Sequence, residues 1–139
     1  MTSTSNRGAQ VSTPLRIELK RDVQAPGLAR GAVSEWSLGA DVSRAQLQTL
    51  VLLVSEVVSN AVLHSKAAPG ATITLTARLD GETVRITVSD AGEGFTPRER
   101  DPEHIGDGYG LFLLDKIASR WGVDRAGPTS VWFELPRSG

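Results

Sequence analysis

An apolar run between residues 44 and 64 constrains this chain more than any other segment, because it predicts a long helix that ends near His64. Asp41 or Ser43 can cap this helix, since either side chain can accept a hydrogen bond from the unpaired amides of the first turn. Its narrow polar edge consists of Gln48, Ser55 and Ser59. A helix with so little polar surface must be covered by other elements, so we expect it at the centre of the fold.

Shorter patterns predict the elements that surround this helix. Alternating apolar and polar residues predict a strand at residues 15–20, with the pattern of an edge strand, and a last strand at residues 131–135. Between them, two alternating runs at residues 72–77 and 84–88 predict a β-hairpin that turns at Asp80-Gly81. Helical spacing of apolar residues predicts two further helices, one from Pro26 to near Gly39 and one from Leu111 to Trp121.

Composition excludes several classes of function. Fifteen Lys and Arg balance sixteen Asp and Glu to a net charge of -1 without a basic run, which disfavours nucleic-acid binding. The chain has no cysteine, which excludes disulfides, thiolate zinc sites and cysteine nucleophiles. His64 and His104, its two histidines, lack the spacing of a His-based metal site.

The 139 residues are expected to form one domain. Residues 1–13 are rich in Ser, Thr, Gly and Gln and predict a disordered tail, which leaves residues 14–139 for the domain. The tail has no apolar segment typical of a secretion signal or a membrane span, so we expect a cytoplasmic protein. Residues 95–107 contain two prolines and many charges and predict a mobile loop.

Glu56 and Asn60 lie four residues apart on the predicted central helix and therefore share one side of it. Leu52, Leu53 and Leu63 flank them there. A carboxylate and an amide in apolar surroundings lose hydration, so something polar should meet them. One interpretation is a structural Glu satisfied by the backbone or by an arginine, and the other is a binding site.

Asp90 stands at the end of an apolar strand and opens the run Asp90-Ala91-Gly92-Glu93-Gly94. An aspartate in this position can accept a hydrogen bond at a fixed place. Gly92 and Gly94 allow a sharp turn and let a flat ligand approach the main chain, because no Cβ is in the way. The alternative is an Asx turn that ends the strand.

A glycine-rich run at residues 106–110 leads into the helix predicted from Leu111. A helix N-terminus presents unpaired amides and the positive end of the helix dipole, which suits phosphate, although a flexible hinge would have the same sequence. Neither the Rossmann nor the Walker pattern is present. Together the three segments supply an acid that can read a base, an amide and carboxylate for a metal, and a phosphate-binding helix start, so they predict a nucleotide site.

These motifs resemble those of the ATPase superfamily that joins gyrase, the heat-shock-90 chaperones, histidine kinases and the MutL proteins (GHKL). Within it, the sequence looks most like the anti-sigma-factor serine kinase branch, over residues 15–136. The motifs are Glu56-x-x-x-Asn60, Asp90-x-Gly92-x-Gly94 and Gly108-x-Gly110-Leu111. The pattern and the resemblance together imply the Bergerat ATP-binding fold, an α+β two-layer sandwich of a mixed, mostly antiparallel sheet with three helices on one face.

The resemblance also implies roles for individual residues. Asn60 is expected to ligate Mg²⁺, Asp90 to receive the adenine amino group of ATP, and Glu56 to act as the general base. Residues 95–107 would form a lid. Backbone contacts are implied for the adenine pocket at Gly92 and Gly94, and for the phosphates at Gly108, Gly110 and Leu111. A hydroxyl of Thr129 or Ser130 could lie near the phosphates, or these residues could form a plain turn.

The function implied by the resemblance is a protein serine/threonine kinase. Such a kinase phosphorylates an anti-sigma antagonist protein, sequesters a sigma factor and forms a homodimer, for which the apolar N-terminal half offers a candidate surface. One alternative is a binding module in which ATP controls partner affinity without phosphotransfer; turnover of a Glu56→Gln variant separates the two. Another is the catalytic part of a histidine kinase, which would require a separately encoded phosphoacceptor.

Overall fold

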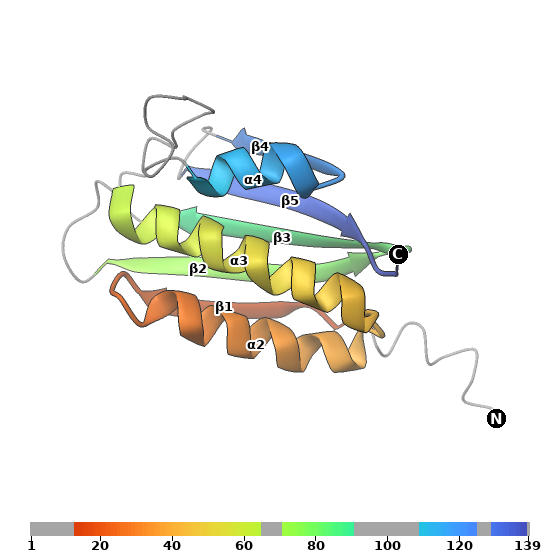
Figure 1. Ribbon diagram of the computed structural model, residues 1–139. Coiled ribbons are helices and arrows are strands. Elements are labelled where there is room, and N and C mark those ends of the chain that lie inside the picture. The colour runs from red at the N-terminus through yellow and green to blue at the C-terminus, as the bar shows by residue number, and fades with distance from the viewer. Residues whose placement is uncertain (1–12, 65–70, 91–108, 125–128, 139) are drawn as a thin grey trace.

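Five strands form one open sheet in the order β1-β2-β3-β5-β4 (Figure 1). The computed structural model describes residues 13–64, 71–90, 109–124 and 129–138. The strands are β1 (Leu15–Lys20), β2 (Thr72–Asp80), β3 (Thr83–Asp90), β4 (Arg120–Asp124) and β5 (Ser130–Pro136). Strand β1 lies at one edge, as its sequence predicted.

Three helices cover one face of this sheet, with α3 between α2 and α4 (Figure 1). They are α2 (Ala25–Gly39), α3 (Arg44–His64) and α4 (Tyr109–Ile117). The predicted α+β fold with helices on one face is confirmed. All four strand pairs in the described part are antiparallel, so the parallel component expected of a mixed sheet does not occur there. The loop predicted at residues 95–107 and residues 1–12 of the predicted tail lie outside the described residues.

The predicted hairpin joins β2 to β3 through a two-residue loop. Asp80 pairs with Thr83, so the loop itself consists of Gly81 and Glu82. Gly81 has a φ of +67°, in the left-handed region, and glycine adopts this conformation without the steric cost that a Cβ would add. This turn fixes the register of the two central strands and therefore the position of Asp90 at the far end of β3.

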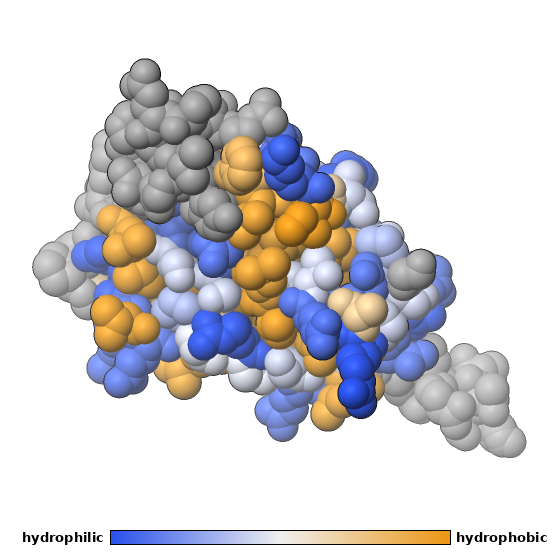
Figure 2. Space-filling model, viewed as in Figure 1, coloured by the Kyte–Doolittle hydropathy of each residue, from blue (hydrophilic) through white to orange (hydrophobic). Residues whose placement is uncertain are grey.

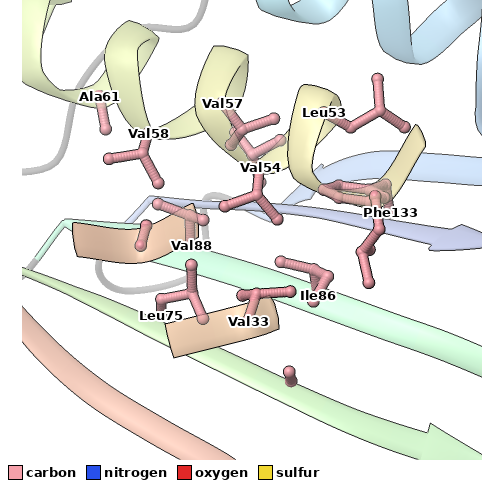
Figure 3. Close-up of a cluster of buried hydrophobic side chains, with 14 of the residues drawn as sticks. Val33, Leu53, Val54, Val57, Val58, Ala61, Leu75, Ile86, Val88 and Phe133 are labelled. Atoms are coloured by element: carbon pink, nitrogen blue, oxygen red, sulfur yellow. The ribbon is translucent and has the colours of Figure 1, made fainter. Parts of the chain in front are cut away.

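The hydrophobic core lies between the sheet and the helices (Figure 3). Val54, Val57 and Val58 of α3 are fully buried against inward-facing residues of the sheet such as Ile86 and Phe133. By length and hydropathy alone, residues 44–63 would also qualify as a membrane span. The packing of its valines on the sheet accounts for this apolarity, as the sequence predicted for a central helix.

Ser43 caps the N-terminus of α3, which resolves the choice between Asp41 and Ser43. The amide of Gln46 donates to the Ser43 hydroxyl oxygen at 3.2 Å. Asp41 instead has a φ of +59° in the connection from α2. The Gln46 side chain donates to the carbonyl of Pro136 at 2.8 Å, which ties the start of α3 to the end of β5.

The third helix ends earlier than its sequence predicted. Helix α4 stops at Ile117, and strand β4 follows at Arg120–Asp124, so Trp121 lies in a strand and not in a helix. Trp121 still packs against the core, as the helical spacing had suggested. On β4 its side chain points to the helical face of the sheet, and the next residue, Gly122, faces the other side. Gly122 pairs with Trp132 of β5, and a Cβ at position 122 would lie 2.9 Å from the Trp132 ring.

We expect Gly122→Ala to lower the free energy of unfolding by about 1–3 kcal/mol, because the added methyl group must displace a large aromatic ring. Urea unfolding measures the change. Gly31→Ala is the matched control, since a Cβ at Gly31 has no atom within 4 Å and alanine favours the helix by about 0.5–1 kcal/mol. Equal stability of the Gly122→Ala variant and wild type would mean that the Trp132 ring does not lie over this glycine.

Candidate nucleotide-binding site

The residues predicted to bind a nucleotide meet at one end of the molecule. Helix α3 ends there, β3 ends there with Asp90, and β5 and α4 begin there (left in Figure 1). The pairing of Asp90 with Ile73 near the start of β2 fixes this arrangement. Segments that are far apart in the sequence therefore bring Asn60, Asp90 and the start of α4 to the same end of the sheet.

Asn60 has a buried amide with no partner. Its side chain is 4% exposed, and both Oδ1 and Nδ2 lack a hydrogen-bond partner within the described structure. Leaving a buried amide unsatisfied costs on the order of 1–3 kcal/mol. Such a group marks a place where a missing partner would belong, and an amide oxygen is a ligand type that Mg²⁺ accepts. Asn60 therefore fits the predicted metal position.

Glu56 lies one turn before Asn60 on α3 and is partly exposed. Ser55 marks the side of α3 that faces α2, because its hydroxyl accepts a hydrogen bond from Arg30 at 2.8 Å. Glu56 and Asn60 lie around the helix from Ser55, toward the side where α4 packs. No described residue forms an ion pair or hydrogen bond with the Glu56 carboxylate, so the purely structural interpretation finds no support there.

Two exposed leucines lie on the same side of α3 as Glu56. Leu52 and Leu63, which share this side of α3, are 43% and 70% exposed. Apolar surface is visible over the same face, between patches of charged residues (Figure 2).

Asp90 is 1% exposed at the end of β3. Its backbone amide donates to the carbonyl of Thr129 at 3.0 Å, which places the buried Thr129 directly beside it. The Ser130 hydroxyl instead lies 2.7 Å from the Ser89 hydroxyl, and both belong to the sheet face opposite Asp90. Thr129 thus lies beside the acid that the sequence predicted to read the base. The sequence left open whether Thr129 or Ser130 lies near the phosphates or forms a plain turn, and the hydrogen bond between Thr129 and Asp90 is not visible in a local pattern.

The glycines of the predicted site are only partly within the described structure. Gly92, Gly94 and Gly108 lie outside the described residues. Helix α4 begins at Tyr109, so Gly110 and Leu111 belong to its first turn. The amides of a first turn have no acceptor within their own helix, and α4 begins at the same end as Asn60 and Asp90. The backbone thus offers donors where the sequence predicted phosphate contacts.

Solved structures of other proteins are similar to this chain. A solved structure of the RsbU and RsbW domains of Rv1364c from Mycobacterium tuberculosis is 25% identical, with a TM-score of 0.71 over 90% of this chain. This chain spans 32% of that structure's length. The histidine kinase domain of the blue-light activated histidine kinase from Erythrobacter litoralis EL346 is 27% identical, over 73% of this chain and 45% of that one, with a TM-score of 0.47.

No curated protein matches this chain significantly. The sequence does match the family described as the histidine kinase-like ATPase domain over residues 19–134, which include Glu56, Asn60 and Asp90 and nearly all of the described fold. The predicted resemblance to the GHKL superfamily is therefore confirmed, and this chain belongs to the histidine kinase-like ATPase domain family.

Proposed function

We propose that this chain is a Mg-ATP-dependent protein serine/threonine kinase of a partner-switching system, an anti-sigma factor that phosphorylates an anti-sigma antagonist. The observation that carries the proposal is the buried amide of Asn60 one turn after the Glu56 carboxylate, since neither side chain has a partner among the described residues. Membership of the family supports ATP binding, and the pair on α3 supports phosphotransfer because it offers a carboxylate for a general base and an amide for a metal ligand. The proposed partners are that antagonist, a sigma factor and a second copy of the chain, in the cytoplasm.

Each site residue has a proposed task. Asn60 would ligate Mg²⁺ through Oδ1, and the buried Asp90 carboxylate would accept the adenine amino group. Bound Mg²⁺ would neutralise charge on the phosphates during transfer. Glu56 would take the proton from the attacking hydroxyl of the partner protein, on the side of α3 that also carries the exposed Leu52 and Leu63.

The backbone would complete the site. Amides at the start of α4 would meet the phosphates, because first-turn amides are unpaired and lie at the positive end of the helix dipole. The proposed contacts are to the phosphates from Gly108, Gly110 and Leu111, and to the adenine from Gly92 and Gly94. Thr129, held beside Asp90 by the backbone hydrogen bond, joins the adenine end of the proposed site.

The RsbW domain in the solved neighbour supports the anti-sigma kinase branch of the superfamily. That structure also contains an RsbU domain, whereas this chain matches about a third of it. The match to its fold covers 90% of this chain, so the elements that hold Glu56, Asn60 and Asp90 are shared. The partner-switching role rests on this likeness together with the motifs of the sequence.

Calorimetric titration with ATP, with and without Mg²⁺, tests the proposed site. We expect binding that requires Mg²⁺, and an affinity about tenfold lower or weaker still in Asp90→Asn, because a hydrogen bond to a charged acceptor contributes about 1.5–3 kcal/mol. The Asp90→Asn variant should also lose its preference for ATP over GTP, since guanine carries an oxygen where adenine carries the amino group.

Ser55→Ala serves as the control, because Ser55 lies on the side of α3 that faces α2 and its loss removes only the contact to Arg30. Wild-type affinity in Ser55→Ala with weakened binding in Asp90→Asn supports the site. Failure of the wild-type chain to bind ATP at all would exclude the proposed kinase.

A further inference from the structure

Arg21 joins the end of β1 to two other elements of the fold. It is the first residue after β1, and its backbone amide donates to the carbonyl of Ala71 at 3.2 Å, directly before β2. Its side-chain Nη1 donates to the carbonyl of Val62 at 3.2 Å, in the last turn of α3. Both contacts lie at the end of the molecule where α3 ends and where the proposed site residues meet (left in Figure 1).

The contact with Val62 satisfies a backbone group that α3 leaves open. The last four carbonyls of a helix have no amide donor within the helix, and helix ends therefore fray. Helix α3 ends at His64, so the Val62 carbonyl belongs to this group. The guanidinium of Arg21 donates to it and brings a permanent positive charge to the negative end of the helix dipole. Arg21 therefore stabilises the last turn of α3 in two ways.

Asn60 depends on this last turn for its position. In an α-helix the Asn60 carbonyl accepts from the amide of His64, so fraying of the last turn would make Asn60 the terminal residue. Its side chain has no hydrogen-bond partner in the described structure, so the backbone of the helix sets where Oδ1 lies. Val62 lies about 200° around the helix from Asn60, so Arg21 supports this turn from the side opposite the amide.

We propose that Arg21 is a positioning residue for Mg-ATP: it holds the last turn of α3 in place, and this turn presents the Asn60 side chain to the metal. The inference rests on the proposed function, because it takes Asn60 as the ligand of Mg²⁺. Adenine is assigned to Asp90, which lies on β3 and is held by the pairing of that strand with β2. Loss of the Arg21 contact should therefore weaken the metal-dependent part of binding and spare recognition of the base.

Amide hydrogen exchange without nucleotide tests the support of the helix end. Arg21→Met keeps a long side chain but removes the charge and the donors. We expect the amides of Leu63 and His64 to exchange at least about tenfold faster in this variant, because the last turn opens locally more often. The amide of Leu53, in the middle of α3, should exchange at the wild-type rate.

Arg78→Met is the matched control for the exchange experiment. Arg78 is exposed on β2, and its side chain points to the sheet face opposite the helices, because its neighbour Ala77 is buried in the core. Its replacement should leave all exchange rates in α3 unchanged. Unchanged exchange of Leu63 and His64 in Arg21→Met would overturn the proposal, and so would an equal acceleration at Leu53, which would indicate a general loss of stability.

The affinities for two ligands separate positioning of the metal ligand from recognition of the base. By calorimetry, we expect Arg21→Met to bind Mg-ATP about tenfold more weakly than wild type. Arg21→Lys keeps a charge and a donor and should bind at least about threefold more tightly than Arg21→Met. Adenosine carries the base without phosphates or metal, and its affinity, measured by NMR titration, should stay within about twofold of wild type in both variants.

The outcomes of this experiment are distinct from those that test the proposed function. Wild-type affinity for Mg-ATP in Arg21→Met, or an equal loss of affinity for Mg-ATP and adenosine, would overturn the positioning role. Failure of the proposed kinase would appear in the wild-type chain, which would then bind no Mg-ATP. The exchange rates are measured without a ligand, so they decide in either case whether Arg21 supports the end of α3.

Discussion

Glu56→Gln is expected to lower the rate of phosphoryl transfer to a partner protein by about 10²–10⁴-fold, the usual contribution of a positioned general base. Glutamine has nearly the same shape but cannot take up the hydroxyl proton. Because Glu56 has no partner among the described residues, its replacement should disturb little else. Transfer of radiolabelled phosphate measures the rate, and calorimetry should show ATP affinity within about threefold of wild type.

Glu35→Gln is the matched control, because Glu35 is an exposed carboxylate on α2 that the site does not use. Neutralising it should leave the transfer rate unchanged. If Glu56→Gln transferred phosphate at the wild-type rate, the carboxylate would not be the base. If neither wild type nor variant transferred phosphate although both bound ATP, the chain would act as an ATP-controlled binding module.

Asn60→Leu is expected to change stability and binding in opposite directions. Leucine of similar volume removes the unsatisfied amide, so the free energy of unfolding without nucleotide should rise by about 1–3 kcal/mol. The same change removes the proposed metal ligand. Mg-ATP at a hundredfold excess over its dissociation constant should add about 2.7 kcal/mol to the stability of wild type and almost nothing to that of the variant.

Ser37→Ala is the control that distinguishes the removal of an unsatisfied polar group from the removal of any buried polar group. Ser37 is 2% exposed, but its hydroxyl donates to the carbonyl of Val33 at 2.8 Å, so its polar atom is already satisfied. We expect Ser37→Ala to give no gain in stability and no change in ATP binding. Urea unfolding with and without Mg-ATP compares the variants, and a destabilised Asn60→Leu that still binds Mg-ATP would contradict the assignment.

The sequence predicted those parts of the fold whose signal is local. The apolar surface of α3, the alternation in β1, β2, β3 and β5, and the turn at Gly81 each depend on residues close in the chain. The position of Asn60 was also predictable, because residues four apart share a side of a helix wherever that helix lies. The cost of burying that amide was predictable as well, and neither of its polar atoms has a partner within the described part of the chain.

The features that sequence analysis missed depend on contacts between distant segments. Helical spacing over residues 111–121 also fits a short helix followed by a strand, and the pairing of β4 with β5, which places Gly122 opposite Trp132, establishes the strand. Thr129 gives no local sign that it lies beside Asp90, since their hydrogen bond joins β5 to β3. Likewise, the amide of Ser43, the residue that caps α3, donates to the carbonyl of Arg137, a distant contact that the sequence pattern does not reveal.

One side of helix α3 packs in the hydrophobic core, and the adjacent side carries the residues proposed to bind Mg-ATP and to act as the base. Val57 and Ala61 are fully buried against the sheet, while Glu56 and Asn60 directly precede them in the chain. A slip of this helix by one residue would move the pair by 1.5 Å along the axis and turn it by about 100°. Substitutions that disturb the packing of α3 in the core should therefore also lower the affinity for Mg-ATP. Natural selection for ATP binding would then also preserve the packing of the core.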